Sequence, residues 1–504
     1  MHVPRRGQSS NSPTSPHLSL RKRRVLGQAL ALLGLVALGG TYILAPKGIH
    51  INWGDTSFFP ASRVPLTPAP SSLIPGVVVG TQGVYLYSDP PSAGQSTAHP
   101  SPEPLSSWGR DLSSSDLLDG LSPWPPNPAF QEDEPALSTL GHFADDIYNL
   151  GPLDLESYNA SLSTFISLAF PEDLQEGLQR GLSRYLAGGQ TEDWDVAKNI
   201  WQTDKTEERY GESQEVVSWK DGRGTSEGWK WDLLSDREAN KWVKQMLKES
   251  RMRMLWDNLP SGILRADTLR YLLLLLQGGI YSDTDTVLLK APSKWGGEYP
   301  RLYKGGEGWL SDKEKERIQA GEAMDAVIGR PSVIVGIEAD VGTREDWFDW
   351  WPRPMQIVQW TMASAPSHPI ALQALLRILQ STASAIDWSH ENSELVDSLQ
   401  GADLPDKPLT VMSEPKEGGP VGVMAWTGPG VWTDAVLSYI RVKYGVMWTD
   451  LRGIQEPLRI GDVVILPVTG FSPGVGNFGS QVPMHRQAMV EHKFRGSWKD
   501  QPKR

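Results

Sequence analysis

The stretch 263–287 constrains the fold most, because it has the pattern of a buried helix, a glycine stop and a strand that carries two carboxylates. Residues 271–276 are apolar throughout, which is typical of a helix covered on most sides by other elements. Gly278 and Gly279 then supply the left-handed backbone that ends helices. We therefore predict a helix over 263–277 followed directly by a strand.

The predicted strand covers 280–286 and is rich in β-branched and aromatic residues. Alternation with a period of two places Tyr281, Asp283 and Asp285 on one face. The two carboxylates then lie roughly 6.5–7 Å apart, so they can share a divalent cation directly or through water. Oxygen ligands of this kind suit Mg²⁺ or Mn²⁺, which bind through one or two carboxylates and the phosphates of a substrate. The segment therefore predicts a nucleotide-sugar site in which a cation neutralises a departing diphosphate.

Strand and helix signals alternate through the C-terminal part of the chain, which indicates an α/β fold. Further strands are predicted at 198–203, 229–234, 332–337 and 462–467. Ser235-Asp-Arg-Glu238 fits a capping box that begins a helix. A second Asp-x-Asp at 193–195 precedes its strand, and we interpret it as a surface turn.

Several segments in a fixed order resemble a known family. Arg265-Ala-Asp-Thr-Leu-Arg270 and Gly278-Gly-Ile-Tyr-Ser-Asp-Thr-Asp285 are similar to the DXD sugar-binding region of glycosyltransferase family 32. Five further segments resemble the fungal initiation-specific α-1,6-mannosyltransferases of that family: Ile200-Trp-Gln-Thr203, Gly336-Ile-Glu-Ala-Asp340, Trp426-Thr-Gly-Pro-Gly430, Phe471-Ser-Pro-Gly474 and His492-Lys-Phe-Arg-Gly-Ser-Trp498. The resemblance spans about 196–498.

The resemblance implies a GT-A fold with a mixed central sheet, a GDP-mannose donor and Mn²⁺, with Mg²⁺ as the alternative ion. It also implies retention of the α configuration and transfer to an oligomannose N-glycan core in the Golgi, where complexes with other mannosyltransferases are expected. By resemblance, Asp267 and Arg270 bind the nucleotide and donor sugar, Tyr281 supports the diphosphate, and Trp201 stacks on the base. Asp267 and Arg270 stand three residues apart, so a local ion pair is the alternative interpretation.

His492 resembles the late metal-binding histidine of related retaining transferases, which makes Asp283, Asp285 and His492 the expected metal ligands. A surface or core histidine is the alternative, and His485 is a weaker candidate. The glycine-rich loop at Gly428 and Gly430 either presents backbone amides to phosphate or sugar hydroxyls or forms an ordinary turn.

Candidates for the acceptor side follow the predicted strand 332–337. Glu338 or Asp340 is expected to orient the acceptor hydroxyl or to assist its deprotonation, and the sequence leaves open which one. Trp347, Trp350 and Trp351 either stack on the acceptor sugar or belong to the core. We expect front-face retention rather than two displacements, because no acid is identifiable as a nucleophile.

The N-terminal part predicts a single-pass type II membrane protein, which the resemblance places in the Golgi. Residues 25–45 are nearly all apolar and follow four consecutive basic residues, so the positive-inside rule makes 1–24 a cytosolic tail and the remainder lumenal. A cleaved signal peptide is the alternative. Residues 46–135 are rich in Pro, Ser and Gly and are expected to form a disordered stem, followed by a helical region at 136–190 and the transferase domain at 191–504. A sequon at Asn159 is consistent with lumenal exposure.

Composition excludes some functions. The net charge of −12 argues against a nucleic-acid partner, and the absence of cysteine excludes disulfides and thiolate chemistry. Two alternatives remain. One is a haloacid-dehalogenase-type phosphotransferase, because residues 283–287 also match an Asp-x-Asp-x-Val nucleophile strand and Asp462 offers a later acid. The other is an accessory Golgi subunit that binds sugar without transfer.

Overall fold

The computed structural model describes residues 154–187, 191–206, 213–220, 227–296, 301–302, 310–341, 350–391, 393–394 and 422–495, with two further strands, β1 (Val77–Val79) and β2 (Tyr85–Tyr87). These two strands pair antiparallel with each other. The predicted cytosolic tail and transmembrane segment lie outside the described residues, as does the rest of the predicted stem. Of the helices in the described ranges, none is long and apolar enough to cross a bilayer.

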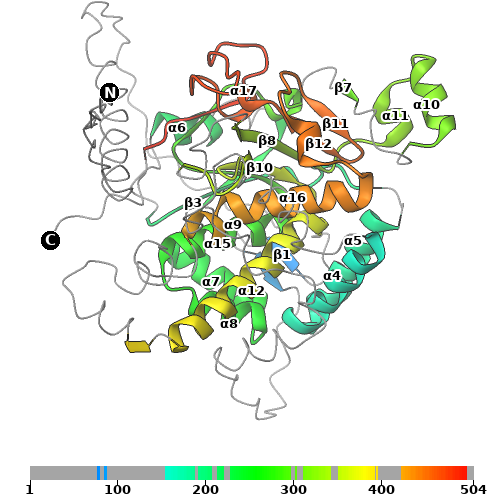
Figure 1. Cartoon of the computed structure of the whole chain (residues 1–504). Helices are drawn as coiled ribbons and strands as arrows, with labels where there is room; N and C mark the ends of the chain where they lie inside the picture. The colour runs from blue at the N-terminus through cyan, green and yellow to red at the C-terminus, as the bar shows by residue number, and fades with distance from the viewer. Residues whose placement is uncertain are drawn as a thin grey trace, which may run out of the picture. The chain divides into compact units, whose positions relative to one another are not determined.

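A nine-stranded mixed sheet lies at the centre of the fold (Figure 1). Its strand order is β4 (Lys230–Ser235), β3 (Asn199–Asp204), β5 (Gly279–Ser282), β10 (Thr361–Ser364), β8 (Val333–Asp340), β12 (Val463–Leu466), β11 (Leu458–Ile460) and β7 (Arg301–Leu302), with β9 (Met355–Ile357) paired to β8. Strands β4, β3, β5, β8 and β12 share one direction, because β10 runs antiparallel to both of its neighbours β5 and β8. The carboxyl ends of β3, β5 and β8 therefore meet at one edge, where open α/β sheets bind ligands.

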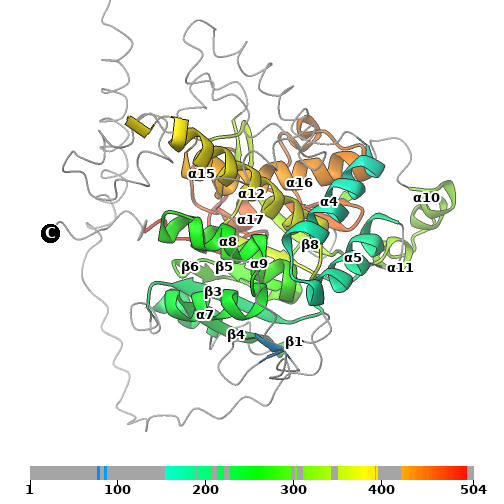
Figure 2. The same ribbon diagram turned by 90° about the horizontal axis from the view of Figure 1, so that it is seen from below.

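Helices pack on the sheet and at its ends, as Figures 1 and 2 show. They are α4 (Leu155–Ala169), α5 (Glu172–Leu186), α6 (Gln214–Lys220), α7 (Asp236–Leu247), α8 (Arg251–Asn258), α9 (Gly262–Gln277), α10 (Asp312–Gln319), α11 (Met324–Ile328), α12 (Pro369–Glu391), α15 (Val423–Trp426), α16 (Pro429–Tyr444) and α17 (Val468–Phe471), with 3₁₀ turns η4 (Pro292–Lys294) and η7 (Trp448–Leu451). The prediction of a mixed α/β fold is confirmed.

Successive residues of the central strands bury against opposite faces of the sheet. Val333, Val335 and Ile337 pack with the helices α4, α9, α12 and α16 in one large core. Ile334 points the other way, into a smaller core that is rich in tryptophan and includes Phe471 of α17. The sheet is thus covered on both faces, as parallel strands require.

The predicted end of the helix at the two glycines is confirmed. Helix α9 ends at Gln277, and Gly278 and Gly279 adopt φ values of 66° and 100°. A Cβ on Gly279 would lie 2.2 Å from the carbonyl oxygen of Asn199, so β3 and β5 approach too closely there for any side chain. The capping box at Ser235 is also present and begins α7.

One predicted boundary is wrong. The strand expected over 280–286 stops at Ser282, turns, and resumes as β6 (Thr286–Leu288), which leaves the central sheet and pairs with β13 (Val490–His492). Helix α16 begins at Pro429, because Pro at the first helical position needs no amide partner.

Candidate active site

The strand gives way to a turn after Ser282. The Asp283 amide donates to the carbonyl of Trp360 at 2.8 Å, which continues the pairing of β5 with β10 by one residue. The carbonyl of Asp283 accepts from the amide of Thr286 at 3.2 Å and from its hydroxyl at 2.6 Å, which closes a turn. The two aspartates therefore converge through a turn and not through the alternation of a strand.

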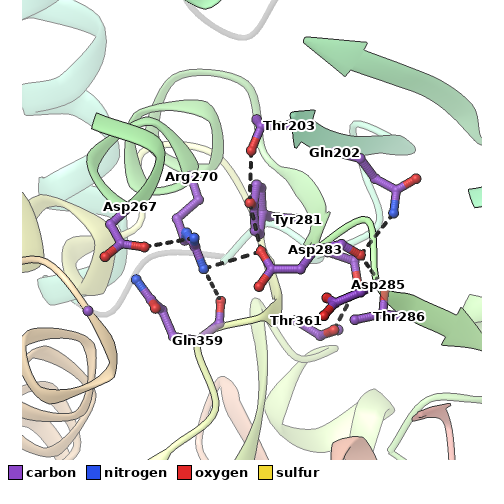
Figure 3. A network of polar contacts seen from close by, with 12 residues as sticks. Gln202, Thr203, Asp267, Arg270, Tyr281, Asp283, Asp285, Thr286, Gln359 and Thr361 are labelled. Carbon is purple, nitrogen blue, oxygen red and sulfur yellow. Dashed lines mark hydrogen bonds and ion pairs between the residues drawn. The ribbon is translucent and has the colours of Figure 1, made fainter. Parts of the chain in front are cut away.

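Residues at the end of β3 hold this turn from the other side (Figure 3). The side-chain amide of Gln202 donates to the carbonyl of Asp283 at 3.1 Å, and the indole of Trp231 donates to Gln202 at 2.9 Å. The hydroxyl of Thr284 donates to Asp204 at 3.1 Å. Strand β3 thus fixes both the backbone and the middle residue of the Asp-x-Asp turn.

The three expected metal ligands lie together. One ligand atom from each of Asp283, Asp285 and His492 lies within 4.8 Å of the other two. His492 Nε2 is 3.1 Å from Asp285 Oδ1, and the imidazole stacks on Trp360 at a centroid distance of 4.5 Å. Pairing of β6 with β13 produces this meeting, because His492 lies opposite Thr286.

The chain after β13 also binds Asp285. The amide of Lys493 donates to its carbonyl at 2.9 Å, and the amide of Arg495 donates to its carboxylate at 3.0 Å. Burial alone would raise the pKa of Asp285, but the hydrogen bonds from His492 and Arg495 lower it overall. Asp285 is therefore an anion ready to bind a cation.

The donor set fits a divalent cation. It offers two carboxylates and an imidazole, and His492 Nδ1 is enclosed with no hydrogen-bond partner among the described residues. Burial raises the pKa of Asp283, as does the nearby Asp285, while Arg270 opposes the effect. Two acids this close repel each other, and a cation would relieve that repulsion.

Arg270 lies between two acids, as Figure 3 shows. Its guanidinium is 2.7 Å from Asp267 and 3.4 Å from Asp283, donates to the carbonyl of Gln359 at 3.2 Å, and lies over the ring of Tyr281. Burial alone would lower the pKa of Arg270, but Tyr281 and the two acids raise it, so the group stays charged. Arg270 therefore does more than form the local ion pair with Asp267, because its guanidinium also contacts Asp283.

Tyr281 and Asp267 are held by second partners. The hydroxyl of Tyr281 donates to Asp283 at 2.9 Å and lies 3.0 Å from that of Thr203. Asp267 accepts from the hydroxyl of Thr427 at 2.9 Å. Burial raises the pKa of Asp267, while Arg270 and Thr427 oppose the shift. The four predicted residues Asp267, Arg270, Tyr281 and Asp283 thus form one connected group.

Two donor-site predictions need correction. Trp201 is fully buried, and its indole donates to the carbonyl of Gly278 at 3.0 Å, so no ring face is available for a base. The amide of Gly428 donates to Val423 at 3.1 Å and does not point toward a ligand. A Cβ on Gly428 or Gly430 would lie within 3 Å of the Met424 backbone, so these glycines allow α15 to pack on α16.

On the acceptor side, the structure distinguishes Glu338 from Asp340. Asp340 Oδ2 accepts from the amide of Gly453 at 2.5 Å, which fixes a turn, while Oδ1 lies 3.6 Å from Arg452 and has no hydrogen-bond partner among the described residues. Glu338 has an enclosed Oε2 with no partner among the described residues, and burial raises its pKa to about 7.

The predicted aromatic residues differ in exposure. Trp350 is 40% exposed, and Trp351 packs edge-on against Phe478 at 5.2 Å. Trp347 lies outside the described residues.

The remaining predicted residues lie away from this group. Asp193 and Asp195 pair with Arg330 on the surface, which confirms their interpretation as a turn. His485 accepts from the amide of Gln487 within its own turn. Asn159 is exposed on α4.

The sequence did not identify several residues that complete the site. Gln202, Thr203 and Thr427 lie inside segments already singled out by resemblance, and their polar side chains next to a predicted strand end or glycine turn were the available signal. Gln359 and Trp360 had none, because they reach the site only through the pairing of β9 and β10 with β8.

Comparison with known proteins gives consistent matches. A family model described as a glycosyltransferase sugar-binding region containing a DXD motif matches residues 193–302. A Schizosaccharomyces pombe protein named initiation-specific α-1,6-mannosyltransferase is 35% identical over 311 residues, or 61% of this chain and 64% of that protein. A Candida albicans protein of the same name is 30% identical over 325 residues, or 60% of this chain and 72% of that protein. The match to the S. pombe protein thus spans a little under two thirds of its length.

Among solved structures, the PaToxG glycosyltransferase aligns with 57% of this chain and 80% of its own at 13% identity and a TM-score of 0.25. At that score the two folds are not established as the same.

Proposed function

Since this chain belongs to the family of glycosyltransferases with a DXD motif in the sugar-binding region, we propose that it transfers mannose from GDP-mannose to the core of an oligomannose N-glycan through an α-1,6 linkage. The observation that carries the proposal is the convergence of Asp283, Asp285 and His492 beside Arg270. The names of the relatives support the donor sugar and the linkage. A mixed sheet in which antiparallel β10 separates β5 from β8 is compatible with the GT-A fold, which we include in the proposal.

Asp283, Asp285 and His492 would hold Mn²⁺, or Mg²⁺ in its place. When bound, the cation would neutralise charge on the departing diphosphate. Arg270 adds a fixed positive charge next to the carboxylate of Asp283, and the fork geometry of its guanidinium suits an anionic oxygen. Tyr281 orients both Asp283 and Arg270, because its hydroxyl donates to Asp283 while its ring lies under the guanidinium of Arg270.

The transfer proceeds by front-face attack in this proposal. The acceptor oxygen bonds to C1 of mannose, the bond from C1 to the phosphate oxygen breaks with its electron pair remaining on GDP, and the acceptor proton moves to that phosphate oxygen. Asp267 and Asp283, the acids beside Arg270, are both held by other side chains, which disfavours either as a nucleophile. Trapping of a mannosyl-enzyme adduct would contradict this step.

The arrangement of the strands argues against the phosphotransferase alternative. Asp462 precedes β12, which is parallel to β8, so it lies at the opposite edge of the sheet from Asp283. Asp462 is also enclosed by the hydroxyls of Tyr439 and Tyr444. A second acid for that chemistry would have to lie beside Asp283.

We further propose that the chain is a type II membrane protein of the Golgi with its catalytic region in the lumen, where it meets N-glycans and other mannosyltransferases. The apolar segment 25–45 and the basic residues before it support this topology.

The test uses the full-length chain in detergent with GDP-mannose, Mn²⁺ and an oligomannose acceptor. We expect a product that carries one added mannose in α-1,6 linkage, established by mass and linkage analysis. The double variant Asp283→Ala/Asp285→Ala should lose transfer, and Asp193→Ala/Asp195→Ala, which removes the surface Asp-x-Asp, should retain it. Transfer that persists in the first double variant would refute the proposal.

A further inference from the structure

Glu338 lies at an irregularity of β8. Ile337 pairs with Ile357 of β9, and Ala339 pairs with Gln356, so Glu338 is an extra residue between two consecutive pairs. Such β-bulges are common beside active sites, where they change the direction of a side chain. The bulge thus gives Glu338 a direction that a regular strand would not.

Gln356 lies beside Glu338, a half-buried residue whose Oε2 is enclosed. Gln356 is fully buried, and neither of its amide atoms has a hydrogen-bond partner in the described part of the chain, nor does Oε2 of Glu338. Burial raises the pKa of Glu338 to about 7, and the neighbouring Gln356 amide offsets this only in part. Most buried polar atoms in proteins have a partner, because leaving one without costs free energy. Gln356 lies within hydrogen-bonding reach of Glu338, and the polar atoms of the two side chains that lack a partner among the described residues are adjacent, which suits a polar ligand.

The pair lies beside the proposed donor site. Strands β8 and β5 run in the same direction, so Glu338 and Asp283 are at the same edge of the sheet. The segment 356–360 connects the two, because it begins at Gln356, donates from Val358 to the Gly336 carbonyl, and ends at Trp360, whose carbonyl binds the Asp283 amide. The same segment supplies the Gln359 carbonyl to Arg270.

We propose that Glu338 and Gln356 form an acceptor subsite that binds two neighbouring hydroxyls of the incoming sugar, with Gln356 as a binding residue that fixes the acceptor's orientation. A vicinal diol offers an O–H donor to the carboxyl of Glu338 and an oxygen acceptor to the amide of Gln356, so it satisfies both groups at once. This inference rests on the proposed function, because it presupposes a sugar acceptor.

The test compares Gln356→Leu with Gln373→Leu in the full-length chain. Gln373 lies on α12, is also buried, and its Nε2 also lacks a partner among the described residues. Its replacement therefore reproduces the effect on the fold of removing such a buried amide, without touching the proposed subsite. We expect KM for the oligomannose acceptor to rise at least about tenfold in Gln356→Leu. KM for GDP-mannose and the release of GDP without acceptor should stay within about twofold of the wild type, and Gln373→Leu should match the wild type throughout.

Acceptors that each lack one hydroxyl supply a second readout. The wild type should use one of these acceptors poorly, because the hydroxyl that Gln356 binds is missing. Gln356→Leu should use that acceptor as well as the intact one, because the variant has already lost the same hydrogen bond. The inference is overturned if Gln356→Leu behaves like Gln373→Leu, or if GDP release without acceptor falls together with transfer. A wild-type chain that neither hydrolyses GDP-mannose nor transfers from it refutes the proposed function instead.

Discussion

His492 Nε2 lies 3.1 Å from Asp285 Oδ1 although the two residues are 207 positions apart in the sequence. The contact exists because β6 leaves the central sheet immediately after the Asp-x-Asp turn and pairs with β13, the last described strand. The C-terminal part of the chain therefore completes the proposed metal site.

His492→Gln should weaken Mn²⁺ binding by at least about tenfold, because it removes one of three protein ligands. Titration of the full-length chain with Mn²⁺, followed by electron paramagnetic resonance, measures the affinity. His485→Gln is the matched control, since His485 makes its contact within its own turn. An unchanged affinity in His492→Gln would remove this residue from the metal site.

Arg270→Lys should lower kcat/KM for GDP-mannose by about 100-fold, because an ammonium group cannot reproduce the fork that reaches Asp267, Asp283 and the Gln359 carbonyl together. Arg330→Lys is a close control. Arg330 also bridges two aspartates, but on the surface, where ion pairs contribute little. Equal losses in the two variants would mean that the charge near Asp283 has no special role.

The sequence was sufficient to predict the residues at the centre of the site but not the geometry that unites them. Asp283 and Asp285 follow a helix and a Gly-Gly stop whose local signals are strong, and these elements form as predicted. Alternation then placed both acids on one strand face, and this was wrong, because the carbonyl of Asp283 accepts from Thr286 and from the Gln202 amide, which hold the backbone in a turn. Contacts from strands that are distant in sequence leave no periodic trace.

The same limit explains the error at Trp201. An indole inside a predicted strand can face a ligand or the core, and the choice depends on which face the helices cover. Here the helical core contains both Trp201 and Tyr281. Tyr281 nevertheless reaches the site, because its hydroxyl extends to Asp283 at the sheet edge.

Glu338→Gln should stabilise the fold at high pH and have little effect at low pH. Burial raises the folded-state pKa of Glu338 to about 7, above the usual 4.5 that applies when the chain is unfolded. Below the unfolded value both states are protonated; as the pH rises from about 4.5 to about 7, the unfolded chain releases its proton while the folded carboxyl keeps it, so the fold loses stability, by roughly 3 kcal/mol at most, and the loss is constant above about pH 7. Urea unfolding of wild type and variant at pH 4.5 and pH 8 measures the difference, which should appear only at pH 8. A difference that does not depend on pH would show that Glu338 titrates normally.

Asp462→Asn should destabilise the fold by about 3–5 kcal/mol, because Asp462 is the only carboxylate of a buried cluster in the described residues and accepts from Tyr439, Tyr444 and His368. Burial alone would raise the pKa of Asp462, but Lys443, His368 and Tyr444 lower it overall. The stability it contributes is therefore present above the unfolded value of about 3.8 and is lost as the pH falls below that value. Thermal unfolding at pH 7 measures the loss. Asp312→Asn, which replaces an acid exposed on α10, is the control and should change the melting temperature little.

Asn159→Gln should abolish the shift in mass that a peptide N-glycosidase produces on the full-length chain extracted from cells with detergent. Asn159-Ala160-Ser161 is a sequon, Asn159 is exposed on α4, and sequons acquire glycans only in the lumen of the secretory pathway. The glycan therefore reports on which side of the membrane the catalytic region lies, independently of any activity. Asn477→Gln replaces an exposed asparagine that is not in a sequon, and it should keep the shift. A wild-type chain with no glycosidase-sensitive mass, in cells that glycosylate a lumenal reporter carrying the same sequon, would contradict the proposed type II topology, because a cytosolic α4 would never meet the oligosaccharyl transfer machinery.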